Sequence, residues 1–246
     1  MAENKGVLYG IGVGPGDPEL LTVKAVRAIK AADVVISPTG KMGEPSIAFR
    51  IAEPYIAKEQ RCLTMDFPML SLSEEREALD AQWQANADAI HAILDRGESA
   101  VFLTLGDPMV YSTYSYVMAY LLQRGLAVET ISGIPSFCNL AARLNIPLTQ
   151  GEESLGVVGM TEPIEKVRAV LDAHQNIVVM KASAGNEALA KELSARGLEQ
   201  HFVMVSNIGM ANQQVTTDIQ ALAGKVPYLS TVLIKKSGLG GFATAE

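Results

Sequence analysis

The chain has 246 residues, of which 48% are hydrophobic and 19% charged, and its net charge at pH 7 is −7. This composition is typical of a globular protein with one large domain or two smaller ones. Lysine and arginine form no dense run, which argues against binding to the phosphates of a nucleic acid. The sequence has neither an apolar run long enough to cross a bilayer nor a secretory signal. We therefore expect a cytoplasmic protein without membrane partners.

Strand-like and helix-like segments alternate along the first part of the chain, which predicts an α/β fold with mostly parallel strands. The second strand is expected to close at Ser37-Pro38, and the long polar helix at Gly97, which suits a left-handed cap. The predicted strands are 7–13, 33–36, 100–105 and 128–131, and the predicted helices are 22–31, 74–96 and 137–144.

The alternation restarts after Ser154, which indicates a second domain. The sequence IPLTQGEES, residues 146–154, contains proline, glycine and polar residues and is typical of a linker. We therefore predict two α/β domains with mostly parallel or mixed sheets, residues 1–148 and 149–246. The predicted strands of the second domain are 155–158, 177–180, 202–205 and 228–234, and its helices are 161–174, capped by Thr161, and 186–196.

The segment GIGVGPGDPELLT follows the first strand directly and has glycine at positions 10, 12, 14 and 16. A dinucleotide-binding loop needs glycine at i, i+2 and i+5, so that the backbone can approach a pyrophosphate. The i+5 positions from the first three glycines are Pro15, Asp17 and Glu19, so no register fits. Acidic residues at a helix start also disfavour phosphate. The segment therefore predicts close backbone approach to a neutral or cationic ligand.

A purely structural interpretation of the same segment is a strand-to-helix turn, with Asp17 as N-cap and Pro18 at the first helical position. Alternating glycines weaken a strand and usually indicate something packed against the backbone, which favours the ligand. A second turn, Gly106-Asp107-Pro108, follows another predicted strand. Ligands of open parallel sheets bind outside the carboxyl ends of the strands, so both turns are expected at one crevice. The alternative is that Asp107 bonds only within its own turn.

Three segments, in this order, resemble the tetrapyrrole methylase family of S-adenosylmethionine-dependent methyltransferases: GIGVGPGDPELLTVKAVRAIKAADVV, LGDPMVYST and ISGIPSF. The similarity extends from Val7 to about Ile234. Within the family, GDPMVYSTYSY, the FPM at 67–69 and YLSTVLI are most similar to the enzymes that methylate C-20 of precorrin-2 or cobalt-factor II in cobalamin biosynthesis. The third segment departs from the family pattern at Pro135, which removes a backbone donor and a hydroxyl from the stretch that faces the cofactor.

The resemblance implies two α/β domains, S-adenosylmethionine folded into the cleft between them, and a homodimer. This cofactor has no phosphate and carries a sulfonium cation, in agreement with loops that lack basic residues. The cofactor-binding positions that the resemblance implies are Pro15, Leu105, Gly106, Asp107, Val110, Pro135 and Ser136, followed in the second domain by Met180, Ile208, Gly209 and Ser230.

The implied reaction is methyl transfer to a meso carbon of a tetrapyrrole, in which the enzyme mainly positions one carbon against another. The catalytic residue is unknown, because the sequence shows no evident general base. The three histidines, at 91, 174 and 201, lie in unrelated contexts and lack metal-ligand spacing. We expect no metal site of the protein itself, so any cobalt belongs to the substrate. Cys62 and Cys138 are expected to be reduced.

The tetrapyrrole is the expected small-molecule partner, and its many carboxylates call for positive residues. Arg50 is the first candidate, beside Lys41 and Arg61, and a solvated surface charge is the alternative for each. Tyr111 and Tyr114 follow the Gly-Asp-Pro turn, where they either stack on the macrocycle or pack at helical spacing.

Three other functions stay open. A methyltransferase of the same family would act on uroporphyrinogen III, a diphthamide precursor or ribosomal RNA, although the acidic charge argues against RNA. A nucleotide-dependent oxidoreductase is disfavoured by the failed dinucleotide pattern. A cofactor-binding regulator without catalysis is the third, and product analysis separates it from an enzyme.

Overall fold

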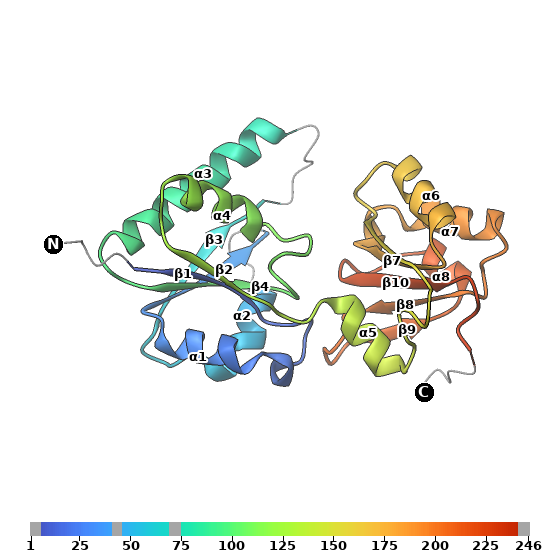
Figure 1. The fold of residues 1–246 in the computed structure, drawn as a ribbon, viewed down its shortest axis with the longest axis horizontal. Helices are drawn as coiled ribbons and strands as arrows, with labels where there is room; N and C mark the ends of the chain where they lie inside the picture. The colour runs from blue at the N-terminus through green and yellow to red at the C-terminus, as the bar shows by residue number, and fades with distance from the viewer. Residues whose placement is uncertain (1–5, 41–45, 69–74, 241–246) are drawn as a thin grey trace. The chain divides into compact units, whose positions relative to one another are not determined.

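The structure, a computed structural model, describes residues 6–40, 46–68 and 75–240. The chain divides into two compact units, Met1–Pro135 and Ser136–Glu246. Each unit has one five-stranded sheet with helices packed on it (Figure 1), which confirms the predicted α/β class. No helix in the described ranges is long and apolar enough to cross a membrane.

The first sheet is wholly parallel. Its strands are β1 (Leu8–Gly12), β2 (Val34–Thr39), β3 (Arg61–Asp66), β4 (Ala100–Thr104) and β5 (Val128–Ile131). They lie in the order β3-β2-β4-β1-β5. All five residues of β4 are buried, which explains why AVFLT shows no alternation of polar and apolar residues. The register pairs Gly12 with Thr104, so β1 and β4 end at the same level.

Two helices cover each face of this sheet, α1 and α2 on one side and α3 and α4 on the other (Figure 1). The helices are α1 (Val23–Ala31), α2 (Ile47–Ala52), α3 (Arg76–Leu94) and α4 (Tyr114–Gln123), with short 3-10 helices η1 (Pro18–Leu20) and η2 (Glu53–Tyr55). The chain runs from β1 to α1 and from β4 to α4, so these neighbouring strands send their connections to opposite faces. Such a switch point is where open α/β sheets bind ligands.

The second sheet is mixed. Its strands are β6 (Leu155–Gly159), β7 (Asn176–Met180), β8 (Phe202–Ser206), β9 (Gln214–Thr216) and β10 (Ser230–Lys235), in the order β6-β7-β10-β8-β9. β6 and β7 are parallel, whereas β10 is antiparallel to both of its neighbours. The helices are α5 (Ser136–Leu144), α6 (Ile164–Ala173), α7 (Asn186–Ala195) and α8 (Ile219–Ala223), with the 3-10 helix η3 (Ala182–Ala184).

The division between the units falls at Ser136, earlier than the boundary at 148/149 that the linker-like composition predicts. α5 packs on β10, and Leu140 of this helix is buried among apolar residues of the second unit. The predicted linker is also held by Lys235, whose buried ammonium donates to the carbonyl of Pro147 (3.0 Å) and pairs with Glu153 (3.3 Å). This segment is therefore part of the second unit.

Two of the predicted element boundaries that differ from the structure lie at prolines. β2 continues through Pro38 to Thr39, because its pairing with β4 has ended by then and proline is tolerated at an edge position. α6 begins at Ile164 with Pro163 in the capping position, so Thr161 is not its N-cap. The residue before a proline is pushed out of the helical region, which prevents an earlier start.

Candidate active site at the strand ends

Three loops meet at the carboxyl ends of β4, β1 and β5: residues 13–17, 105–110 and 132–135. The first two are joined by a reciprocal pair of hydrogen bonds. The Gly14 N–H donates to the Gly106 carbonyl (3.2 Å), and the Gly106 N–H donates to the Gly14 carbonyl (2.8 Å). The loops that leave the switch point are thus fixed to each other directly beyond the sheet.

Asp107 connects the second loop to the third. Its Oδ1 accepts the Met109 N–H (2.8 Å), which is the local bond expected of an aspartate in a turn. Its Oδ2 accepts the Gly133 N–H (2.9 Å) from the loop after β5. The alternative that Asp107 bonds only within its own turn is therefore wrong, because the carboxylate also holds a separate loop.

The alternating glycines of the first loop accommodate the protein's own atoms. A Cβ on Gly10 would lie 2.0 Å from Cζ of Tyr114, so the tyrosine ring occupies the space that a side chain would need. A Cβ on Gly12 would lie 2.5 Å from Cα of Gly133, and one on Gly133 would lie 2.1 Å from the Gly106 carbonyl oxygen. The inference of a ligand against the backbone is wrong for Gly10 and Gly12, since protein atoms fill both positions.

The structural interpretation of the same turn is confirmed. Asp17 is the N-cap of η1, where its Oδ1 accepts the Glu19 N–H (2.9 Å), and Pro18 is the first helical residue. Thr22 caps α1 by accepting the Ala25 N–H (3.1 Å). Asp17 at this helix start is therefore explained by capping, without a ligand.

Space and charge at the three loops restrict what can bind there. Gly106 has φ +72°, and within 4 Å a Cβ on it would meet, of the described residues, only the Ile134 carbonyl oxygen and Cα of Pro135, both at 3.9 Å. The hydroxyl of Thr104 is buried and has no hydrogen-bond partner within the described ranges. The loops contain two aspartates and no lysine, arginine or histidine. A ligand with polar atoms and no phosphate fits these properties.

The structure brings the first group of predicted cofactor positions together on these loops. Val110 is fixed by its N–H, which donates to the Asp107 carbonyl (3.2 Å). Ser136 begins α5 in the second unit, and its Oγ lies 3.0 Å from Oγ1 of Thr231. The predicted positions on the three loops are Pro15, Leu105, Gly106, Asp107, Val110 and Pro135.

The predicted positions of the second unit, Met180, Ile208, Gly209 and Ser230, share one edge of the second sheet, where β7 and β8 end and β10 begins. The Ile208 side chain is buried in the core. The Gly209 N–H donates to Oε1 of Gln213 (2.9 Å). Met180, at the end of β7, is half-buried.

Ser230 is occupied by protein contacts. Its Oγ donates to the Pro227 carbonyl (2.7 Å) and lies 2.6 Å from Oγ of Ser206. The side chain therefore fixes the start of β10.

The two candidate tyrosines have different environments. Tyr114 is fully buried, with its ring centroid 5.7 Å from that of Phe102 and its hydroxyl 2.9 Å from Oγ1 of Thr130. Stacking of Tyr114 on a substrate is therefore a wrong prediction, because the ring belongs to the core. Tyr111 is 44% exposed and has φ 49°, which is uncommon for a bulky residue. Only Tyr111 remains as a substrate-stacking candidate.

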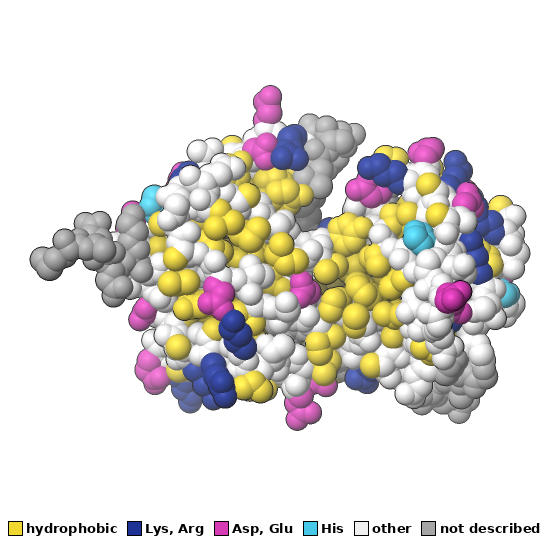
Figure 2. Space-filling model, viewed as in Figure 1, with side chains coloured by type: hydrophobic (Ala, Val, Ile, Leu, Met, Phe, Trp, Pro, Cys, Tyr) yellow, Lys and Arg dark blue, Asp and Glu magenta, His cyan; other side chains and the backbone are white. Residues whose placement is uncertain are grey.

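The basic residues predicted to bind the substrate carboxylates also differ in their positions. Arg50 is exposed in the last turn of α2. Arg61 pairs with Glu98 (3.1 Å) at the start of β3, at the opposite end of the sheet from the three loops, so it is not a substrate residue of this site. Lys41 lies outside the described residues. In Figure 2, basic side chains stand in small groups beside acidic ones over the visible face.

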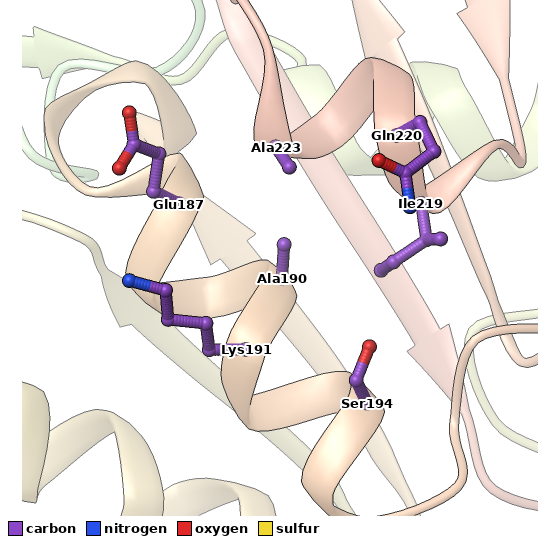
Figure 3. Close-up of a pocket in the computed structure, with 7 residues that line it drawn as sticks. All are labelled: Glu187, Ala190, Lys191, Ser194, Ile219, Gln220 and Ala223. Carbon is purple, nitrogen blue, oxygen red and sulfur yellow. The ribbon is translucent and has the colours of Figure 1, made fainter.

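A shallow hollow of about 360 Å³ lies elsewhere in the second unit, between α7 and α8 (Figure 3). No predicted site residue lines it. The residues that line the hollow are Glu187, Ala190, Lys191, Ser194, Ile219, Gln220 and Ala223.

The described ranges contain no group of three or more His, Cys, Asp or Glu side chains able to hold a metal ion.

A sequence model of the tetrapyrrole (corrin/porphyrin) methylases matches residues 7–223. The chain belongs to this family. The methylase is 32% identical over 236 residues to the cobalt-precorrin-2 C(20)-methyltransferase of Salmonella typhimurium, covering 94% of this chain and 97% of that protein. It is 33% identical over 238 residues to a probable cobalt-precorrin-2 C(20)-methyltransferase of Methanocaldococcus jannaschii, covering 93% and 96%.

Among solved structures, the methylase is similar to a uroporphyrin-III C-methyltransferase from Thermus thermophilus, which was crystallised with S-adenosylhomocysteine. The TM-score is 0.66 at 23% identity, over 94% of this chain and 99% of that one. This similarity confirms the two-domain α/β fold.

Proposed function

We propose that this methylase transfers a methyl group from S-adenosylmethionine to C-20 of precorrin-2 or of its cobalt-containing counterpart, cobalt-factor II. The observation that carries the proposal is similarity along almost the whole chain to relatives named as C(20)-methyltransferases. The three loops at the β1/β4 switch point support a small-molecule site at the strand ends.

The residues at the three loops fit S-adenosylmethionine. They offer no basic side chain for a phosphate, and they leave open space beside Gly106. Next to them, at the end of β4, the hydroxyl of Thr104 has no hydrogen-bond partner among the described residues. Pro15, Leu105 and Val110 are the apolar residues proposed to surround the cofactor here, with Gly106 providing close backbone approach. The remaining proposed contacts are Asp107, Pro135, Ser136, Met180, Ile208, Gly209 and Ser230.

S-adenosylmethionine supplies a methyl group that is already activated by its sulfonium. The protein's contribution is therefore positioning rather than acid–base chemistry, and rigid placement of two reactants accounts for a large part of the acceleration of such reactions. Asp107 holds the Gly133 loop, and the backbones of Gly12, Gly106 and Gly133 are in direct contact. These contacts join the three loops to one another.

The proposal includes a homodimer in the cytoplasm. The free thiol of Cys62 is exposed, which suits a reducing compartment. Light scattering on the purified protein tests the dimer directly.

The function is tested by incubating the protein with S-adenosylmethionine labelled with ¹³C in the methyl group. Precorrin-2, cobalt-factor II and uroporphyrinogen III serve as separate acceptors. We expect one labelled methyl on C-20 of precorrin-2 or cobalt-factor II, identified by NMR of the product. Labelling of uroporphyrinogen III alone, or of another carbon, would contradict the proposal.

A further inference from the structure

Lys181 directly follows β7 and has a left-handed backbone, with φ 53°. In the described ranges, the other non-glycine residues with positive φ are Tyr111, Asn145 and Asn207. Asparagine tolerates this conformation, whereas lysine and tyrosine are uncommon there. Strained backbone that the surroundings enforce is concentrated at functional sites. Tyr111 is already a candidate for the acceptor, so Lys181 is the outlier without a role.

Lys181 is a partly buried residue, and its ammonium forms no hydrogen bond or ion pair within the described part of the chain. Burial lowers the pKa of Lys181 from the ordinary lysine value, and no carboxylate counteracts this effect. Other cations with restricted access to water have partners: Lys235 pairs with Glu153, and Arg196 pairs with Asp172. Partial burial of an unpaired cation is unfavourable, so the position suits an anion that arrives with a ligand.

Lys181 also lies at the edge of the sheet that holds the predicted ligand contacts of the second unit. It follows Met180 in the chain. β7 ends at Met180, and the antiparallel strand β10 begins at Ser230, so Lys181 follows β7 at the end of the sheet where β10 begins. Lys181 therefore lies at the same end of the sheet as Met180 and Ser230.

We propose that Lys181 binds a carboxylate of a ligand at this edge, and that the carboxylate belongs to a side chain of the tetrapyrrole acceptor. The inference rests on the proposed function. The amino-acid carboxylate of the cofactor is the other source of the same chemistry. Repulsion between the ammonium and the sulfonium favours the acceptor.

The test compares Lys181→Met and Lys181→Arg with wild type. Methionine has a similar unbranched chain and meets the same backbone strain, so the first variant removes mainly the charge. Lys225→Met is the matched control, because it removes an exposed lysine from the same unit. Two quantities are measured: KM and kcat for the acceptor at saturating S-adenosylmethionine, and calorimetric affinity for S-adenosylhomocysteine. Thermal unfolding confirms that each variant folds, and Lys181→Gln replaces the methionine variant where it does not.

We expect Lys181→Met to raise the KM for the acceptor about tenfold or more, because the variant loses a charge-assisted contact with the carboxylate. S-adenosylhomocysteine affinity should be unchanged, and Lys181→Arg and Lys225→Met should behave nearly as wild type. A loss of S-adenosylhomocysteine affinity with an unchanged KM assigns the bound carboxylate to the cofactor. Unchanged values for both ligands overturn the inference. A wild-type protein that is inactive with every acceptor contradicts the proposed function instead.

Discussion

Oδ2 of Asp107 accepts the backbone N–H of Gly133 at 2.9 Å, although the two residues stand 26 positions apart in the chain. The bond joins the loop after β4 to the loop after β5. The other carboxylate oxygen accepts the Met109 N–H (2.8 Å), so both oxygens receive backbone donors. One side chain therefore fixes two of the three loops of the candidate site, and this geometry determines what its replacement does.

Asp107→Asn is expected to be strongly perturbing despite its similar shape. An amide offers one acceptor oxygen, so its NH₂ group must face either the Met109 or the Gly133 N–H, donor against donor. We expect a loss of about 1–3 kcal/mol in the free energy of unfolding, measured with urea. Affinity should fall equally for S-adenosylmethionine and S-adenosylhomocysteine, because the carboxylate acts through the loops.

Asp17→Asn is the matched control for this change. Asp17 accepts a single N–H, from Glu19, so an amide oxygen can replace its contact. We expect little change in stability or affinity for this variant. A loss confined to the sulfonium form in Asp107→Asn would instead indicate that the carboxylate faces the cofactor.

Gly12→Ala tests the direct contact between the loop backbones. The added Cβ would lie 2.5 Å from Cα of Gly133, and neither backbone can move away as a flexible side chain would. We expect destabilisation of about 1–3 kcal/mol, together with weaker binding of S-adenosylhomocysteine. Gly224→Ala is the control, since its Cβ would find its nearest neighbour at 3.4 Å. Equal behaviour of the two variants would contradict the described packing.

Variants of Tyr114 and Tyr111 are expected to have opposite effects on stability and on the KM for the acceptor. Tyr114→Phe removes the hydrogen bond to Thr130, so we expect a loss of about 1 kcal/mol in unfolding free energy and an unchanged KM for the acceptor. Tyr111→Ala removes an exposed ring, so we expect a raised KM and little change in stability. Steady-state kinetics and thermal unfolding of both variants separate the roles. A raised KM for Tyr114→Phe would restore this residue as a substrate contact.

Glu153 gives the second unit a dependence on pH. Hydrogen bonds from the Asn176 side chain and the Gln150 N–H, followed by Lys235, hold the pKa of Glu153 below its usual value of 4.5. Because the pKa is lower in the folded state, the ionised Glu153 carboxylate stabilises the fold. This stabilisation is present above the ordinary carboxyl range and is lost as the pH falls through the folded pKa.

Glu153→Gln isolates that contribution. At neutral pH the variant should unfold at a lower urea concentration than wild type, because it has no charge to pair with Lys235. The difference should shrink as the pH falls below 4.5, the ordinary glutamate value, since wild type then loses the same charge. A difference that does not depend on pH would exclude the ionised carboxylate as its cause.

The alternation of segments predicted most of the strands and longer helices because their burial pattern is periodic or continuous. β3 was not predicted, since RCLTMD is exposed over much of its length at the sheet edge and contains polar residues. α2 is short, and its capping residue Ser46 is not followed by a long apolar period. The antiparallel direction of β10 is set by a tertiary pairing that leaves no local pattern in the sequence.

The candidate site shows a similar division. Local chemistry was sufficient for Asp17 and Pro18, whose capping roles depend on neighbouring residues. The partners of Gly10 and Asp107 are Tyr114 and Gly133, which are far away in the chain, so no sequence window contains both. Lys181 was missed for a different reason, because its signal is partial burial without a hydrogen-bond or ion-pair partner among the described residues, which no sequence pattern shows.

The central claim is that the loops after β1 and β4 hold S-adenosylmethionine, and Gly106→Leu tests it most directly. A Cβ at Gly106 enters space that the protein leaves open, so a longer side chain there would occupy the position of the ligand. Gly125→Leu is a closely matched control, with φ +70° against +72° and no atom of the described residues within 4 Å of its Cβ. Both variants therefore carry the same backbone strain.

The decisive measurement is calorimetric titration of S-adenosylhomocysteine into wild type and these two variants, with circular dichroism to follow the fold. We expect wild type and Gly125→Leu to bind in the micromolar range or tighter, about −8 kcal/mol, and folded Gly106→Leu to show no binding. Wild-type affinity in folded Gly106→Leu would contradict the site.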